Sequence, residues 1–162
     1  MLKITFHISS MHDNDILMLA TDDDFRYALF TGDVVLESDD AKIELCWGWI
    51  PLLDFAYSLM CISDSLRTQE NASESFEFTE SDAILLFQKE GSSLTISASF
   101  SSDKIQIDFL AFSCGIEAFH SELVTRLSLE YPSLLSNSIF KRLGLYISPQ
   151  EKECLCHDKK NI

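Results

Sequence analysis

The chain of 162 residues is 46% apolar and 11% aromatic, with only five glycines and three prolines, so it predicts one packed domain and excludes a fibrous or low-complexity chain. Its formal net charge is −14. Phosphates repel a polyanion of this kind, so we expect no direct binding to nucleic acid or to an anionic membrane surface.

The first third of the chain has the pattern of short strands. Apolar and polar residues alternate over 2–8, which predicts a half-buried opening strand. Two β-prone runs, 25–30 and 34–36, are joined by Thr31-Gly32-Asp33, where we expect a tight hairpin with the glycine at positive φ. The alternation over 42–45 predicts another strand.

A helix and then a run of strands follow. Pro51 suits a first helical turn, and apolar residues recur every three or four positions after it, so we expect a helix over about 51–67. Four short runs then read as an antiparallel meander with turns at Gly91-Ser92 and at 101–103. These runs are 76–78, 84–87, 93–100 and 104–109.

The last third of the chain predicts helices. Apolar spacing from Ile116 to Tyr131 indicates an amphipathic helix that ends before Pro132. A shorter helix is expected within 134–143. Strands that do not alternate with helices favour an α+β fold, an antiparallel sheet with two to three helices packed on one face. We expect a single domain over 1–149 and a disordered tail over 150–162.

Nothing in the sequence indicates export. The first ten residues lack the basic start and apolar core of a signal peptide. The longest uncharged apolar stretch, around 45–53, is about nine residues long, well short of the ~20 that cross a bilayer. Five cysteines are an odd number and fit a reducing compartment, so we expect a cytoplasmic protein.

The sequence contains no catalytic or cofactor motif. There is no Gly-x-Ser-x-Gly elbow and no glycine-rich phosphate loop, and each of the four histidines is expected to be a surface or structurally satisfied residue. Cys154, Cys156 and His157 have a metal-like spacing but lack a second pair of ligands, so zinc is not expected. The Asp13–Asp15 and Asp22–Asp24 clusters would bind a divalent cation only weakly. We therefore expect neither an enzyme nor a bound cofactor.

The acidic excess belongs to one half of the chain. Residues 1–81 carry 16 acidic and four basic residues, a net charge of −12, whereas residues 82–162 carry ten and eight, a net charge of −2. A charged surface can serve solubility alone. Because the charge is so unevenly divided, a binding surface for a basic partner is an equally good interpretation.

Two tryptophans stand beside the acidic segment 37–44. Trp47 and Trp49 flank a glycine just before the expected helix, and the simplest interpretation is a lid over the core. The alternative is an aromatic anchor at an interface, since tryptophan is enriched among binding hot spots. An apolar centre with a charged rim is what such an interface would look like.

The order of these elements resembles a known group of bacterial proteins. A helix that opens Trp49-Ile50-Pro51-Leu52-Leu53-Asp54-Phe55, then Phe76-Glu77-Phe78, a Leu85-Leu86-Phe87 strand and a later amphipathic helix are similar to immunity proteins of contact-dependent inhibition and related polymorphic toxins. The resemblance covers about residues 2–135 and rests on apolar patterns, so no binding residue is carried over from it.

The resemblance implies a protein that neutralises a cognate toxin by stoichiometric binding. Many such toxins are nucleases with basic clefts, which an acidic surface can cover. The protein would be a monomer or a weak homodimer. The residues expected to contact the toxin are Asp22, Asp23, Asp24, Glu37, Asp39, Asp40 and Glu44, with Trp47 or Trp49 as the anchor.

Two other function classes remain open. An acidic secretion chaperone would bind an extended effector segment and would usually be a homodimer with apolar grooves. An enzyme that acts on a cationic substrate would show carboxylates converging in a cleft.

Overall fold

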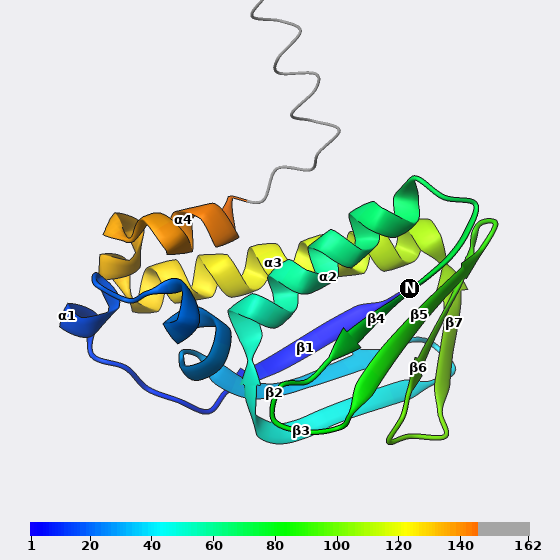
Figure 1. The fold of residues 1–162 in the computed structure, drawn as a ribbon, viewed down its shortest axis with the longest axis horizontal. Coiled ribbons are helices and arrows are strands. Elements are labelled where there is room, and N and C mark those ends of the chain that lie inside the picture. The colour runs from blue at the N-terminus through cyan, green and yellow to red at the C-terminus, as the bar shows by residue number, and fades with distance from the viewer. Residues whose placement is uncertain (146–162) are drawn as a thin grey trace, which may run out of the picture.

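Two antiparallel sheets form most of the strand structure in the computed structural model, which describes residues 1–145 (Figure 1). One sheet has the strand order β1-β2-β3 and the other has the order β4-β5-β6-β7. The expected α+β class is confirmed, with the strands divided between these two sheets. The strands are β1 (Lys3–Ile8), β2 (Thr31–Glu37), β3 (Lys42–Pro51), β4 (Asn71–Glu77), β5 (Ile84–Glu90), β6 (Ser93–Ala98) and β7 (Lys104–Asp108).

Two long helices pack against each other and cover both sheets. Figure 1 shows α2 and α3 crossing the molecule together, with the three-stranded sheet on one side and the four-stranded sheet at one end. Within residues 1–145 no helix is long and apolar enough to pass through a membrane. The helical elements are α1 (Asn14–Leu17), the π-helical turn η1 (Asp24–Ala28), α2 (Leu52–Arg67), α3 (Phe109–Glu130), the 3₁₀ turn η2 (Pro132–Ser136) and α4 (Ser138–Gly144).

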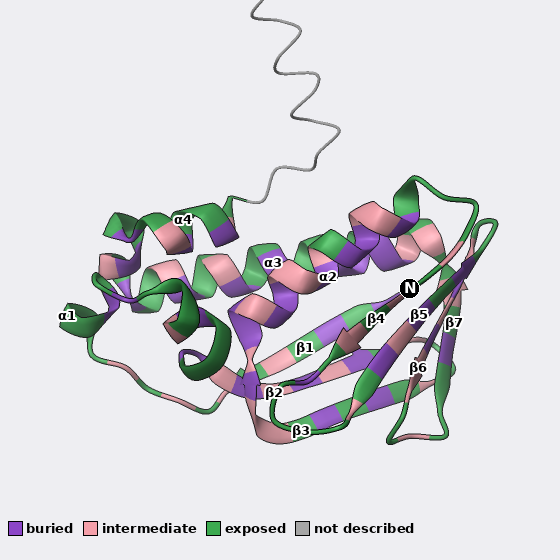
Figure 2. Cartoon of the chain, viewed as in Figure 1, coloured by how far each residue is buried: buried purple, intermediate pink, exposed green. Residues whose placement is uncertain are grey.

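The buried side chains of the two sheets and the helices form one contiguous core. Less exposed positions alternate with more exposed ones along β1 and β2, as the period of a half-buried strand requires (Figure 2). Phe55 of α2 lies at the centre: its ring centroid is 5.0 Å from that of Phe76, 6.0 Å from Phe78 and 6.3 Å from Phe119. Phe55 of α2 therefore contacts β4, the loop that follows β4, and α3.

A buried lysine connects the four-stranded sheet to the end of α2. Lys89 of β5 is 8% exposed, and its Nζ donates to the carbonyls of Leu66 (2.9 Å) and Gln69 (2.5 Å). The same ammonium lies 4.5 Å from the ring centroid of Phe109. The last carbonyls of a helix have no partner within the helix and carry partial negative charge. The Lys89 ammonium therefore supplies hydrogen bonds and positive charge to carbonyls whose burial would otherwise be unfavourable.

The expected hairpin over 25–36 is wrong. Residues 24–28 form a π-helical turn instead, because Thr21 and Asp24 close a local turn in which the Asp24 carboxylate accepts from the Thr21 amide and hydroxyl. Gly32 lies inside β2 opposite Ile8, without a positive φ. A Cβ at Gly32 would lie 1.9 Å from the carbonyl oxygen of His7, so glycine is needed here for the close approach of β1.

The other expected elements are confirmed with shifted ends. The helix predicted from 116 begins at Phe109, because the Asp108 carboxylate caps it by accepting from the Leu110 amide at 2.8 Å. It ends at Glu130, before Pro132, as expected. The short helix expected over 134–143 is divided into η2 and α4 by Asn137, whose side chain caps α4. The tail expected to be disordered, with Cys154, Cys156 and His157, lies outside the described residues.

Two histidines are held by hydrogen bonds to the backbone, His120 in a buried position and His12 in a half-buried one. His120 is 6% exposed and its Nε2 lies 2.7 Å from the Leu143 carbonyl. His12 Nε2 accepts from the amide of Phe30 (3.1 Å), a buried residue held at φ 52°. Because Nε2 accepts this hydrogen bond, it carries no proton and the His12 ring is neutral. The contact also stabilises the positive φ of Phe30, which residues other than glycine rarely adopt. Burial lowers the pKa of both histidines, against an opposing hydrogen bond in His120.

The lowered histidine pKa values predict loss of stability in mild acid. Above pH 6.5 both histidines are neutral whether the chain is folded or unfolded, so their contribution is fully present. Below that value the unfolded chain takes up protons that the folded protein resists, so the free energy of unfolding falls. We expect urea denaturation between pH 7.5 and 5 to show this slope, and His12→Gln to reduce it.

The matched control is His7→Gln, because His7 is exposed on β1. It should leave the slope unchanged. A slope that is identical in wild type and His12→Gln would contradict the assigned role of His12.

Candidate functional site

Four of the predicted acidic residues lie around the turn between β2 and β3. Glu37, Asp39, Asp40 and Glu44 are all exposed. Lys42 Nζ lies 2.6 Å from Glu44 Oε1, and the N-terminal ammonium lies 3.4 Å from Asp39 Oδ2. These exposed pairs screen part of the acidic charge, so the hairpin acids form a surface with interspersed cations rather than a uniform anionic patch.

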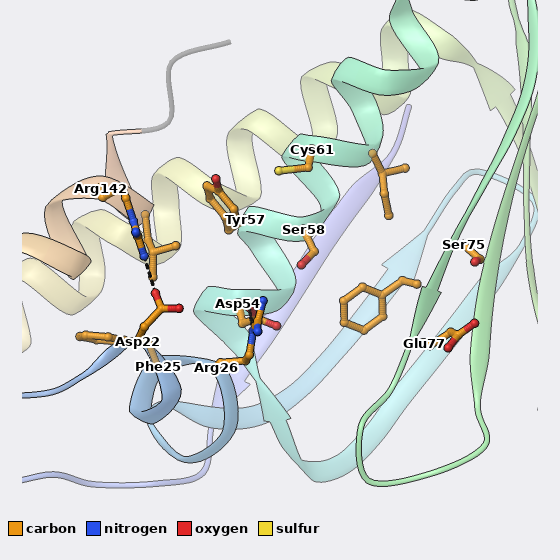
Figure 3. A pocket seen from close by; sticks show the side chains of 13 residues that line it. Asp22, Phe25, Arg26, Asp54, Tyr57, Ser58, Cys61, Ser75, Glu77 and Arg142 are labelled. Carbon is orange, nitrogen blue, oxygen red and sulfur yellow. Dashed lines mark hydrogen bonds and ion pairs between the residues drawn. The ribbon is translucent and has the colours of Figure 1, made fainter. Parts of the chain in front are cut away.

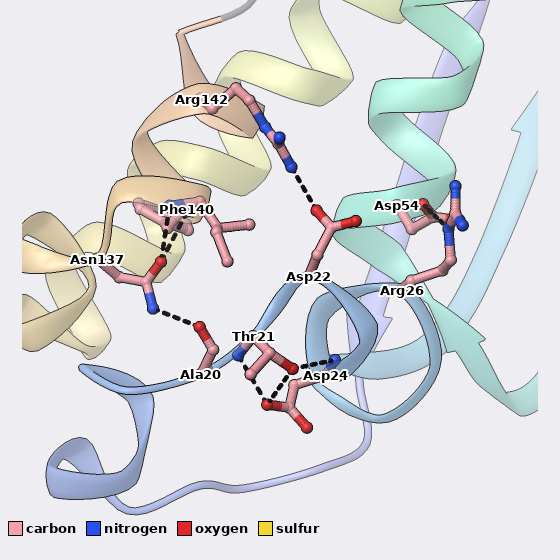
Figure 4. Close-up of polar contacts among 10 residues, drawn as sticks. Ala20, Thr21, Asp22, Asp24, Arg26, Asp54, Asn137, Phe140 and Arg142 are labelled. Atoms are coloured by element: carbon pink, nitrogen blue, oxygen red, sulfur yellow. Dashed lines mark hydrogen bonds and ion pairs between the residues drawn. The ribbon is translucent and has the colours of Figure 1, made fainter.

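The other three predicted acids lie at the start of η1: Asp22 and Asp23 precede it, and Asp24 is its first residue. Asp22 forms an ion pair with Arg142 of α4 (Figure 4). Asp23 is exposed. Asp24 is turned toward its own chain, and its pKa is lowered by the hydrogen bond from the Thr21 backbone and then by the one from the Thr21 hydroxyl. Asp24 is therefore a local capping residue in this structure.

The structure does not bring the seven predicted acids into one patch. Asp22–Asp24 precede the start of β2, and the hairpin acids surround its far end (Figure 1). The seven residues of β2 that separate them correspond to about 23 Å of extended strand. Two separate acidic groups result, at opposite ends of the three-stranded sheet.

The two tryptophans lie in an irregular part of β3. The pairing register with β2 shifts between Gly32 and Val34, so Asp33 stands opposite a bulge in β3. Gly48 has a φ of 74°, and its amide donates to Asp33 Oδ1 at 2.6 Å. The bulge allows Trp47 and Trp49 to stack, with ring centroids 5.1 Å apart and an interplanar angle of 14°.

The stacked tryptophans lie at the seam between the two sheets. The centroid of Trp47 is 5.1 Å from Phe78, in the loop after β4, and 4.9 Å from Phe100, in the loop after β6. Both tryptophans are half-buried and pack against the core, as the lid interpretation predicts. A shallow hollow of about 390 Å³ beside them is also lined by Asp82.

A larger pocket lies where η1, α2, β4 and α4 meet (Figure 3). Its volume is about 500 Å³, within the range of small-ligand sites. Aromatic side chains form part of its wall, and charged groups of both signs surround it. The polar lining residues are Asp22, Arg26, Asp54, Tyr57, Ser58, Cys61, Ser75, Glu77 and Arg142.

Asp54 is the least exposed of the three carboxylates that line this pocket. Its side chain is 27% exposed, against 54% for Asp22, and Glu77 is exposed. Arg26 Nε lies 3.8 Å from Asp54 Oδ1. Burial raises the pKa of Asp54, and the Arg26 charge opposes that rise. Burial, followed by the neighbouring Cys61 thiol, raises the pKa of Tyr57.

Sequence reasoning found only one residue of this pocket, Asp22. Asp54 occupies the first turn of α2, where a carboxylate is ordinary because it complements the helix dipole. Arg142 comes from α4, 120 residues away from its partner Asp22. Only the tertiary fold brings these groups together, so no local signal could have identified the pocket.

No three His, Cys, Asp or Glu side chains among residues 1–145 are arranged to hold a metal ion. Comparisons with protein-family models, with curated proteins and with solved structures found nothing that matches this chain.

The bulge geometry predicts a specific effect of Gly48→Ala. An L-residue at a φ of 74° is strained by about 1–2 kcal/mol, so we expect a loss of stability of that size in urea denaturation. The tryptophan stack should also be disturbed, which near-UV circular dichroism would record. Cys46→Ala, at the exposed neighbouring position, is the control and should change stability by less than about 0.5 kcal/mol. Equal effects of the two substitutions would contradict the role given to the bulge.

Proposed function

We propose that this protein is an immunity protein that binds a basic toxin domain, a nuclease domain, and neutralises it in a stoichiometric complex. The observation that carries the proposal is the division of charge, −12 in residues 1–81 and −2 in residues 82–162. Six of the seven predicted acids are exposed, and Asp24 is half-buried, with its carboxylate bonded to Thr21.

The acidic residues suit a partner that carries phosphate-binding surfaces. A nuclease cleft is basic because it holds phosphates, and opposite net charges steer two proteins together at up to 10⁸–10⁹ M⁻¹s⁻¹ at low salt. Two acidic groups, about 23 Å apart along β2, can contact a cleft and its rim at the same time. Neutralisation needs binding alone, so the proposal requires no cofactor and no reaction.

One observation favours the alternative, an acidic secretion chaperone for an extended effector segment. Within residues 1–145, β4 pairs with β5 alone, and a strand edge without a paired neighbour can accept an extended chain. Such a chaperone is expected to be a homodimer, whereas the immunity protein is expected to be a monomer or a weak homodimer. The mass of the purified protein in solution, alone and with its partner, distinguishes these two functions.

Charge reversal at the hairpin tests the proposal. We expect the triple substitution Asp39→Lys, Asp40→Lys and Glu44→Lys to weaken binding at least about tenfold, because several charge pairs are lost at once. Affinity would be measured by calorimetry against the purified cognate toxin domain, and protection would be measured as survival of cells that express the toxin.

The control changes the net charge equally but in the other half of the chain, at Glu90, Asp103 and Glu122, which are all exposed. This control variant should weaken binding to the toxin domain by less than about threefold. Equal losses in the two triple variants would show an effect of net charge alone. Unchanged affinity in the hairpin variant would contradict the assigned surface.

A further inference from the structure

Exposed apolar side chains gather at the end of the molecule where α1 lies (Figure 1). Of the twelve large apolar residues that are exposed within residues 1–145, four lie between positions 11 and 19, and they are 50–92% exposed. A single exposed apolar residue is ordinary, but a group as dense as this indicates an interaction surface. We call these four residues the α1 apolar cluster: Met11, Ile16, Met18 and Leu19.

The fold does not need these four side chains. Leu17 is the one buried residue of α1. The backbone around it is held by Asn137, whose Nδ2 donates to the carbonyl of Leu17 at 3.0 Å and to that of Ala20 at 2.9 Å (Figure 4). Ser133 Oγ donates to the carbonyl of Asn14 at 2.7 Å. Hydrogen bonds and one leucine therefore fix this segment, and the α1 apolar cluster is left facing solvent.

Ile16 and Leu19 form the centre of the cluster. The Leu19 amide donates to the Ile16 carbonyl at 3.2 Å, and side chains three positions apart in a helical turn lie on the same face. η2 packs beside α1 and carries a further exposed apolar residue, Leu135. Because the backbone is already fixed, a partner that binds here does not have to order a loop, which lowers the entropic cost of binding.

Carboxylates flank the cluster along the chain. From Met11 to Asp24 the sequence has five aspartates and neither lysine nor arginine. Asp13, Asp15 and Asp23 are exposed. Asp15 and Asp23 form no ion pair with any residue among 1–145. An apolar centre with a charged rim is the composition of a protein interface, and this rim includes one of the two predicted acidic groups.

The charge of the rim decides which occupant fits. Two copies of this chain facing each other here would bring aspartates of both copies together in a poorly hydrated interface, where like charges repel. Anionic lipid headgroups would be repelled in the same way. A protein surface that carries lysines or arginines around an apolar centre complements both the cluster and its rim.

We propose that the α1 apolar cluster docks on an apolar patch of the partner protein that is rimmed by lysine or arginine. The inference rests on the proposed function in one respect, that the partner is basic. It adds an apolar anchor to the acidic group Asp22–Asp24, which was otherwise described by its charge alone.

The first test removes one apolar side chain at the centre of the cluster. We expect Leu19→Ser to weaken binding to the purified cognate toxin domain at least about tenfold in calorimetry, because the burial of a leucine side chain is lost. The matched control is Leu110→Ser, at the opposite end of α3 beside β7 (Figure 1). Leu110 is 70% exposed, against 83% for Leu19, and its substitution should change affinity by less than about twofold.

The second test uses a probe that does not depend on the toxin. A peptide of four Leu-Lys-Lys-Leu repeats forms a helix with an apolar stripe and a basic rim, and the same peptide with serine for leucine keeps the charge. Each is titrated into the ¹⁵N-labelled protein. We expect saturable shifts in the amide signals of residues 11–24 and 132–136 with the leucine peptide, and binding at least about tenfold weaker with the serine peptide. Leu19→Ser should weaken the leucine peptide and Leu110→Ser should not.

Four results would overturn the proposal. These are equal binding of the two peptides, shifts confined to residues 37–44, a dimer in sedimentation that Leu19→Ser converts to a monomer, and binding to phosphatidylcholine vesicles that Leu19→Ser abolishes. The third result would identify the occupant as a second copy and the fourth as a membrane.

The two tests separate this inference from the proposed function. If Leu19→Ser keeps full toxin affinity while the hairpin variant loses it, the proposed function stands and the docking site is wrong. If the leucine peptide binds as expected but no basic toxin domain does, the docking site stands and the proposed function fails.

Discussion

The contact of Phe55 with the four-stranded sheet and with α3 is the constraint on which the rest of the structure depends. Its ring meets Phe76 and Phe78 on one side and Phe119 of α3 on the other, at centroid distances of 5.0–6.3 Å. Each sheet has one apolar face, and both faces must be buried against the same pair of helices. The four-stranded sheet is therefore held at the end of the helix pair rather than continuing the three-stranded sheet.

This arrangement explains where the special residues lie. β4 approaches α2 at Phe76, and Ser58 of α2 lies beside that contact and lines the pocket. At the other end of α2, Lys89 satisfies the last carbonyls of the helix. Around β3 the seam between the sheets is closed by the Trp47–Trp49 stack. The candidate site and the tryptophan seam are thus two consequences of one packing arrangement.

The sequence predicted those parts of the fold that depend on local periodicity. The opening strand, α2, the meander and the end of α3 at Pro132 follow from apolar spacing and from proline chemistry. The π-helical turn at Asp24–Ala28 was missed because the residues of this segment favour a strand. The hydrogen bond from the Thr21 hydroxyl to the Asp24 carboxylate stabilises the turn instead. The division into two sheets was missed because strand partners are chosen by tertiary packing.

The candidate site was less predictable than the fold for the same reason. Acidic clusters are visible in the sequence, but their separation by the length of β2 and the pairing of Asp22 with Arg142 are not. Asp54, Glu77 and Arg142 belong to three elements, and none of them is unusual within its own element. What the sequence supplies reliably is the sign of the charge and the half of the chain that carries it.

In the proposed function, this charge steers binding to a basic partner. The most direct measurement is the association rate constant with the toxin domain as a function of ionic strength. We expect a fall of at least about tenfold between ~0.02 M and ~0.5 M salt, with a much smaller change in the dissociation rate constant. An association rate that is independent of salt would contradict it.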